Sequence, residues 1–259
     1  MLLRFIVSSI LVILAILNTQ RVYSASEYSA YHHTPFTAKI AIIIDDLGYN
    51  KKNSIAALEL PGAITYAIIP YSPYASLSAQ TALKKQKEII LHAPMSNVRN
   101  VPLGKVALTE EMGEHAFNHT LTQAIESLPN ITGVNNHMGS LLTQQTLPMA
   151  WTMKILQEKG LYFIDSRTTP RSVAWKTARK HNIPSLKRDV FIDNERNHHA
   201  IHKQFNQLID IAKRQGYAVA IAHPYPETID YLSQRLPTLK QDKVTLVKTS
   251  ELVFADHTL

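Results

Sequence analysis

Short apolar runs alternate with helical patterns along most of the chain. The runs are rich in β-branched side chains, and several are apolar at consecutive positions rather than at every second one. That pattern is typical of parallel strands buried on both faces of a sheet. It predicts strands at 39–45, 64–70, 88–93, 131–137, 161–166, 189–193 and 217–224, with an eighth at 244–248.

Two of the helices between these strands have recognisable ends. One is predicted to follow Thr109 as its N-cap, with Glu110 and Glu111 in its first turn, and to stop at Pro129. The other covers 198–216, keeps its apolar residues on one face and ends at a glycine. A strand and a helix repeated some seven times predict an α/β fold with a parallel sheet. So many units in one domain favour a closed or nearly closed barrel over an open doubly wound sheet.

The first 24 residues have the pattern of a secretory signal peptide. An early arginine precedes an apolar run of about 13 residues, short for a membrane-spanning helix, and short side chains precede a possible cut before Ala25. An uncleaved N-terminal anchor is the alternative. Residues 25–37 are polar and lack periodicity, which predicts a linker before a single domain at 38–259. We therefore expect a periplasmic protein without a stable membrane span after signal cleavage.

Charge and composition exclude some classes of binding partner and some catalytic mechanisms. The formal net charge is +7, or +5 without Arg4 and Arg21, which suits an anionic envelope partner. Basic residues are scattered and do not alternate with aromatic ones, so nucleic-acid binding is not expected. The chain has no cysteine, which excludes a thiol nucleophile, and no GxSxG motif. No GxGxxG follows the first predicted strand, so nothing supports a dinucleotide site.

Side chains suited to chemistry stand at the ends of the predicted strands. In an α/β barrel, active sites lie at the C-terminal ends of the strands. Five of the first seven predicted strands end in a carboxylate or an imidazole, and barrel closure would bring these groups together. The residues concerned are Asp45, Asp46, His92, Asn135, Asn136, His137, Asp165 and His223.

The types of these residues fit a metal-dependent hydrolase. Asp45 and Asp46 repel each other unless a cation neutralises them. One aspartate with two neutral imidazoles is a common ligand set for Zn²⁺ that leaves a position open for water. A second aspartate can accept the proton of that water, and a further histidine can protonate a leaving group.

Each of these residues also has a purely structural interpretation. The Asp45–Asp46 pair could belong to a turn or an N-cap, and Asp165 could cap the helix that follows it. His92 could be a core histidine that bonds a backbone carbonyl, while His137 and His223 stand in or before turns. Their joint occurrence at strand ends favours the functional interpretation for the whole group.

Six segments carry a resemblance to a known family. They are AIIIDDLGYN, ILHAPM, GVNNHMGS, YFIDSRT, KRDVFID and IAHPYPETI, in the order and at the spacings of the divergent polysaccharide deacetylases of bacterial envelopes. The resemblance covers nearly the whole region after the predicted signal peptide. It implies a distorted seven-stranded (β/α) barrel that hydrolyses N- or O-acetyl groups of cell-wall sugars with a divalent metal, usually Zn²⁺.

The resemblance also implies roles for individual residues. It implies that Asp45 is the catalytic base, Asp46 and His92 are metal ligands, and His223 is the general acid. Asp165 resembles a support that holds and tunes a catalytic partner.

The chain departs from the superfamily pattern at one ligand. Typical members carry a second ligand histidine four residues after the first, whereas APMSN follows His92 here. His137, on the fourth predicted strand where relatives often have an arginine, is our candidate replacement. Asn135 and Asn136 are expected to orient substrate or neighbouring groups, and Trp175 and Tyr225 could stack on a sugar or pack in the core.

The sequence therefore predicts a hydrolase that removes acetyl groups from an envelope polysaccharide, such as one related to peptidoglycan, with Zn²⁺ as its cofactor. The alternative is a catalytically inactive carbohydrate-binding or scaffold protein of the cell envelope. Hydrolysis of a phosphoester or a peptide at the same metal is a third hypothesis.

Overall fold

All strands of the described chain run parallel. The computed structural model describes residues 37–104 and 106–257, so the predicted signal peptide and nearly all of the predicted linker lie outside the described residues. In the described part, nine strands pair in the order β6-β5-β4-β3-β2-β1-β8-β7, and β9 also pairs with β1. Their bounds are β1 (Ala38–Leu47), β2 (Thr65–Ile68), β3 (Glu88–Met95), β4 (Gly133–Met138), β5 (Tyr162–Asp165), β6 (Ser185–Lys187), β7 (Val190–Phe191), β8 (Tyr217–Ala222) and β9 (Val244–Leu246).

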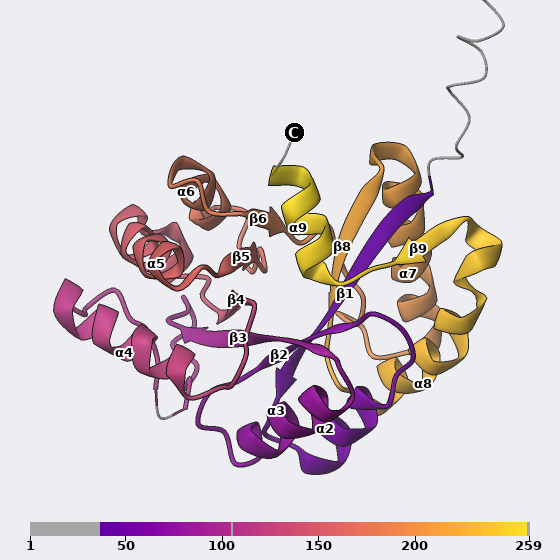
Figure 1. Cartoon of the computed structure of the whole chain (residues 1–259), viewed down its shortest axis with the longest axis horizontal. Coiled ribbons are helices and arrows are strands. Elements are labelled where there is room, and N and C mark those ends of the chain that lie inside the picture. Colours follow the sequence, from indigo (N-terminus) through magenta and orange to yellow (C-terminus); the bar gives the residue numbers. More distant parts are fainter. Residues whose placement is uncertain (1–36, 105, 258–259) are drawn as a thin grey trace, which may run out of the picture. The chain divides into compact units, whose positions relative to one another are not determined.

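Most helices pack around the outside of the curved sheet, and the last one packs against the barrel interior (Figure 1). They are α2 (Lys51–Leu58), α3 (Ala75–Lys84), α4 (Glu114–Glu126), α5 (Thr146–Lys159), α6 (Ala174–Lys180), α7 (His198–Gln215), α8 (Pro226–Arg235) and α9 (Thr249–His257), with short 3₁₀ turns η1 (Leu142–Gln144) and η2 (Leu236–Asp242). Among the helices of the described residues, none combines the length and the apolar character that a membrane crossing needs.

The barrel is open between two strands that are neighbours in the sequence. β6 and β7 form the two ends of the strand order, and only Arg188 and Asp189 separate them along the chain. The result is the distorted parallel barrel that the sequence predicted. All eight predicted strands are confirmed, whereas β6 was missed because its three residues include only one apolar side chain, Leu186.

Both faces of the sheet are buried, as the continuous apolar runs predicted. On β1, Ile40, Ile42 and Ile44 belong to the core between the sheet and the helices, while Ala41 and Ile43 face the barrel interior. The interior cluster also contains Leu252 and Val253 of α9.

One predicted helix start was wrong. α4 begins at Glu114 with Gly113 as its N-cap, and not after Thr109. The reason is that Leu108 pairs with Met95 at the end of β3, and its N–H donates to the carbonyl of Pro94, so this segment is extended. The prediction for α7 is confirmed: it starts at an Asn197 N-cap and ends at Gly216, whose φ of 94° suits glycine.

Candidate metal centre

Asp45 and Asp46 lie where β1 departs from regular geometry. The register between β1 and β2 shifts between Ile44 and Leu47, and Asp46 has a φ of 60°. In a regular strand, neighbouring side chains point to opposite faces. Here the irregularity lets both carboxylates reach His92, whose Nε2 lies 3.6 Å from Asp45 Oδ2 and 3.2 Å from Asp46 Oδ1.

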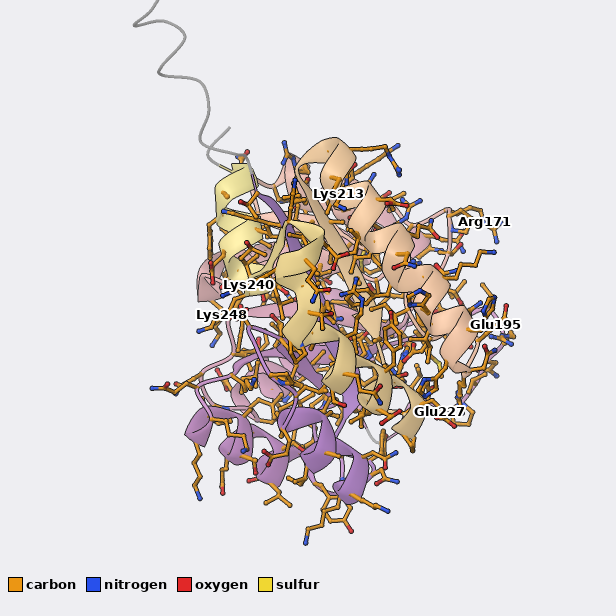
Figure 2. The ribbon with its side chains drawn as sticks, turned by 90° about the vertical axis from the view of Figure 1, so that its right-hand side faces the viewer. Arg171, Glu195, Lys213, Glu227, Lys240 and Lys248 are labelled. Atoms are coloured by element: carbon orange, nitrogen blue, oxygen red, sulfur yellow. The ribbon has the colours of Figure 1, made fainter. Side chains whose placement is uncertain are left out.

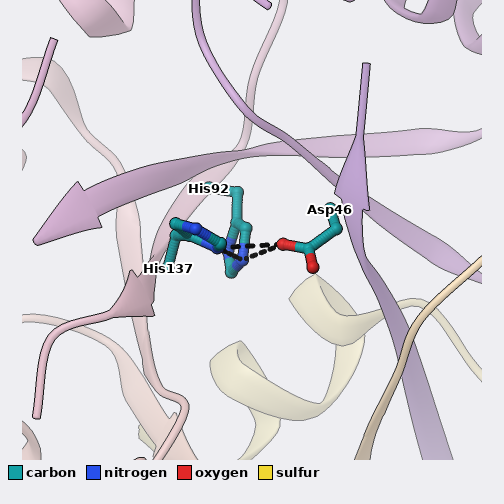
Figure 3. Close-up of side chains that lie close together, drawn as sticks. All are labelled: Asp46, His92 and His137. Atoms are coloured by element: carbon teal, nitrogen blue, oxygen red, sulfur yellow. Dashed lines mark hydrogen bonds and ion pairs between the residues drawn. The ribbon is translucent and has the colours of Figure 1, made fainter. Parts of the chain in front are cut away.

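Three donor atoms from three strands converge at this point (Figure 3). Asp46 Oδ1 lies 3.2 Å from His92 Nε2 and 2.9 Å from His137 Nδ1, and the two imidazole nitrogens are 3.1 Å apart. β3 and β4 bring the histidines together because their register pairs His137 with Pro94, two residues after His92. These three side chains form the one potential metal-binding group found among the described residues.

The three donors fit a divalent metal ion. A tetrahedral ion with bonds of roughly 2.1 Å holds its ligands about 3.4 Å apart, close to the separations observed here. Asp46 Oδ1 is also buried without a hydrogen-bond partner, although both imidazole nitrogens lie within 3.2 Å of it. Buried carboxylate oxygens without partners are costly, and a cation would satisfy this one.

Asn135 connects the base candidate to a ligand candidate. Its Nδ2 donates to Asp45 Oδ1 at 2.8 Å, which leaves its Oδ1 facing His92 Nδ1 at 2.7 Å. The amide oxygen can only accept, so His92 Nδ1 must carry a proton. Nε2 of a neutral His92 therefore has a free lone pair directed at Asp46 and His137, which is the tautomer that a metal ligand requires.

A third imidazole approaches the same carboxylate from the end of β8, which pairs with β1 on the side away from β2. His223, just after β8, has its Nε2 3.8 Å from Asp46 Oδ2. Its Nδ1 lies 2.9 Å from Asp193 Oδ1, and its backbone N–H donates to Asp193 Oδ2 at 2.6 Å. Phe191 and Tyr225 stack on the ring from either side, with centroids at 5.1 and 5.4 Å. The imidazole is thus fixed in orientation, with Nδ1 held by Asp193 and Nε2 facing Asp46.

A model of the divergent polysaccharide deacetylase family matches residues 42–253. The chain belongs to this family.

Two bacterial relatives extend the match. The chain is 38% identical over 215 residues to the Escherichia coli K12 protein YibQ. The aligned region covers 83% of this chain and 67% of YibQ. It is 37% identical over 221 residues to a Haemophilus influenzae protein, covering 85% of this chain and 78% of that one. Both relatives are described as uncharacterized, so they support the family without adding an activity.

Two solved structures share the fold of this deacetylase-family chain. Protein ATU2773 of Agrobacterium tumefaciens, described as uncharacterized, superposes with a TM-score of 0.81 at 22% identity, over 85% of this chain and 91% of that one. A putative cellobiose-phosphate cleavage protein of Enterococcus faecalis gives 0.63 at 12% identity, over 83% and 99%. At these identities the likeness concerns the fold alone.

The surroundings of Asp45 and Asp46 shift the pKa values of these two aspartates in opposite directions. Burial raises the pKa of Asp45 above its ordinary value, although the nearby His92 and His223 oppose this. Burial acts in the same direction on Asp46, but His137 and His92 outweigh it and hold the pKa of Asp46 well below its ordinary value. Asp45 is therefore the better proton acceptor and Asp46 the permanent anion.

His223 is held in its protonated form. Burial disfavours the charge, but the carboxylate of Asp193 outweighs it, and the pKa of His223 rises to about 9. Sequence reasoning missed Asp193, although it ends the predicted strand 189–193 and thus carries the same signal as the other strand-end residues.

Asp165 and Asn136 hold the segment that follows β5. Asp165 accepts hydrogen bonds from the backbone N–H of Arg167, the hydroxyl of Ser172 and the backbone N–H of Trp175. These contacts support the segment after β5, and Asp193 is the carboxylate that holds His223. The predicted role of Asp165 toward a catalytic partner stays a prediction.

Both predicted substrate-orienting amides are buried. Asn136 accepts from Ser166 N–H and donates to the carbonyl of Met138, while Asn135 bridges the metal centre as described above. Their direct contact with substrate stays a prediction. Of the two aromatic candidates, Tyr225 covers His223, whereas Trp175 donates from Nε1 to the carbonyl of Ser185.

Proposed function

We propose that this protein is a metal-dependent carbohydrate deacetylase that removes acetyl groups from an envelope polysaccharide, with Zn²⁺ as its ion. The observation that carries the proposal is the convergence of Asp46, His92 and His137 within 3.2 Å of one another. A buried carboxylate and a carboxylate-bound imidazole flank these three donors, so each part of a hydrolytic site is present. Family membership supports the choice of an acetylated polysaccharide as substrate.

A divalent ion bound by these three residues would polarise the acetyl carbonyl and lower the pKa of a water molecule toward neutrality. Asp45 accepts a proton from the attacking water, whose oxygen forms a bond to the acetyl carbon. The raised pKa of Asp45 makes it a stronger base than an exposed aspartate. Asn135 keeps the Asp45 carboxylate in place during this step.

His223 completes the reaction on the other side. The bond between the acetyl carbon and the sugar nitrogen or oxygen breaks, and Nε2 of protonated His223 gives its proton to the leaving atom. Asp193 keeps His223 protonated and directs Nε2 toward the site. The products are acetate and the free amine or hydroxyl of the sugar. The periplasmic location included in this proposal rests on the sequence pattern of residues 1–24 alone.

The test combines metal analysis with acetate release. Purified protein is stripped with a chelator and reloaded with Zn²⁺, and acetate is then measured after incubation with N-acetylated and O-acetylated glycans. We expect one Zn²⁺ per chain and acetate release, with both lost in His137→Ala. His119→Ala serves as the matched control, because this histidine is exposed on α4.

Two outcomes would contradict the proposal. Wild-type protein that retains no divalent ion would exclude the metal-dependent mechanism. Stoichiometric Zn²⁺ without acetate release from any of the glycans would favour the inactive carbohydrate-binding or scaffold alternative.

A further inference from the structure

A pocket lined by three arginines lies beside the metal centre. Its volume is about 530 Å³, and Arg99, Arg167 and Arg188 contribute to its wall. Arg188 belongs to the two-residue link between β6 and β7, so the pocket lies at the opening of the barrel.

Two contacts place this arginine pocket close to His223 and His137. Phe191 lines the pocket and stacks on His223, with ring centroids 5.1 Å apart. Thr168 also lines it, and its hydroxyl donates to the carbonyl of Met138, the residue after His137. A sugar chain with an acetyl group at the metal centre would therefore pass close to the pocket.

Positive charge exceeds negative charge in the pocket, because three arginines share its lining with one aspartate. Among the residues that the structure describes, none of the three guanidinium groups has a carboxylate within 4.0 Å. Asp189 is the one acidic residue in the lining, and its Oδ2 accepts from the N–H of Val219. Arginines that share a pocket repel one another, and an oxyanion would relieve that repulsion through charge-assisted hydrogen bonds.

One side of the pocket, formed by Arg188 and the backbone of Arg167, is held in place before any ligand binds. Arg167 has a φ of 52°, its N–H donates to Asp165 Oδ1 at 2.8 Å, and its carbonyl accepts from Arg188 Nη2 at 2.9 Å. Arg188 also donates from Nε to the carbonyl of Ser166 at 2.7 Å and lies over the ring of Phe191 at 5.0 Å. Because the guanidinium of Arg188 is already fixed, this group needs little ordering on binding.

From these contacts, and resting on the proposed function, we infer that the arginine pocket binds an oxyanion substituent of the substrate glycan. The substituent is a carboxylate or a phosphate on the acetylated sugar or on its neighbour. The substrate class is then an acidic acetylated polysaccharide rather than a neutral one.

The test measures binding by calorimetry, with acidic probes and their neutral matches. A tetrasaccharide of alternating N-acetylglucosamine and glucuronate is compared with tetra-N-acetylglucosamine, and N-acetylglucosamine 6-phosphate is compared with N-acetylglucosamine. The first pair tests a carboxylate and the second a phosphate. We expect one acidic probe to bind at least roughly tenfold more tightly than its neutral match.

Single charge removals identify the pocket as the source of that preference. Arg99→Gln and Arg167→Gln are each expected to remove most of it, a loss of roughly tenfold in affinity for the acidic probe, with binding of the neutral probe unchanged. Arg171→Gln is the matched control, because it removes the same charge from the segment after β5 outside the pocket lining; Figure 2 shows Arg171 at the edge of the molecule. The control should keep the full preference.

Equal affinities for acidic and neutral probes would overturn the inference, and so would an equal loss in Arg171→Gln. These measurements need no turnover, so they are independent of the deacetylase assay. A retained preference for acidic probes in a protein that never releases acetate would contradict the proposed function and leave the oxyanion pocket in place. Acetate release without any acidic preference would contradict the pocket alone.

Discussion

Buried carboxylates stand at both ends of the parallel sheet, in different surroundings. At the N-terminal end, Glu88 begins β3 and accepts hydrogen bonds from the hydroxyls of Thr65, Thr132 and Tyr162 at 2.8–2.9 Å. The backbone N–H of Ser250 in α9 adds a longer one. Neutral donors thus satisfy the carboxylate, and they join β2, β3, β5, α9 and the residue before β4.

At the C-terminal end, the carboxylates face titratable groups. Asp46 Oδ1 is buried without a hydrogen bond, its backbone has a φ of 60°, and its close neighbours are the imidazoles of His92 and His137. A left-handed non-glycine residue and an unsatisfied oxygen both cost stability. The two ends therefore use the same functional group differently: Glu88 joins elements of the fold, and Asp46 remains available for a ligand.

The largest expected effect is a loss of metal affinity on substitution of Asp46, with little change in the stability of the fold. Asp46→Asn keeps the size of the side chain and tolerates the left-handed backbone, but it removes the charged ligand. We expect Zn²⁺ affinity to fall by more than about 100-fold, beyond the range typical of residues that only support ligands. The free energy of unfolding of the metal-free protein should fall by less than about 1 kcal/mol.

Competition with a chelating dye measures the affinity, and urea unfolding measures stability. Asp210→Asn, on the exposed face of α7, is the matched control and should change neither quantity. Zn²⁺ affinity within tenfold of wild type in Asp46→Asn would remove Asp46 from the ligand set.

The next effect concerns Asp193, the residue that holds the proposed general acid His223. Asp193→Asn leaves the shape of the site but removes the charge that raises the pKa of His223 to about 9. A general acid works only while protonated, so activity is lost as pH rises through its pKa. The substitution lowers that pKa, and the alkaline limb of the kcat/KM profile should move to lower pH.

We also expect turnover of the proposed reaction to fall by about 100-fold in Asp193→Asn, the size typical of a lost proton donor. Zn²⁺ affinity should stay within a few-fold of wild type, because Asp193 contacts none of the three proposed ligands. An unchanged pH profile would show that His223 is not the acid.

The opposite end of the sheet should respond in stability alone. Glu88→Gln replaces one of the two accepting carboxylate oxygens by an NH₂ group. At least one buried hydroxyl donor therefore loses its acceptor. The free energy of unfolding should fall by about 2 kcal/mol, while Zn²⁺ affinity stays unchanged. Urea unfolding tests this against Glu158→Gln, an exposed control on α5. A drop in Zn²⁺ affinity would mean that the two ends are coupled.

The fold could be predicted from the sequence because its strands are buried on both faces. Continuous apolar runs marked eight strands, and only β6, with one apolar residue, escaped. The start of α4 was misjudged because its apparent cap, Thr109, follows a residue that pairs with β3. A local helix signal cannot reveal a bridge to a strand 13 residues earlier, since that pairing depends on tertiary structure.

The site could be predicted as a set of strand ends, but not as a geometry. The strand-end signal identified Asp46, His92 and His137, which the structure brings together. It could not show that Asp45 and Asp46 point to the same imidazole, because that follows from the irregularity of β1. It also could not show which carboxylate would hold His223, because β7 pairs with β8 only in the folded sheet.

The smallest effect distinguishes two roles for Asn135. As the bridge between Asp45 and His92, it fixes the tautomer of a proposed ligand and is not itself among the proposed ligands, so Asn135→Ala should weaken Zn²⁺ binding by about tenfold. Asn136→Ala is the matched neighbour: its amide bonds only Ser166 and Met138, so it should lower the free energy of unfolding with Zn²⁺ affinity nearly unchanged. If Asn135→Ala instead raises KM with normal Zn²⁺ affinity, the amide contacts substrate as the sequence suggested. A tenfold loss of Zn²⁺ affinity with unchanged KM would show that Asn135 supports His92. The buried amide at the C-terminal end would then orient a proposed metal ligand, whereas the Glu88 network at the other end joins strands.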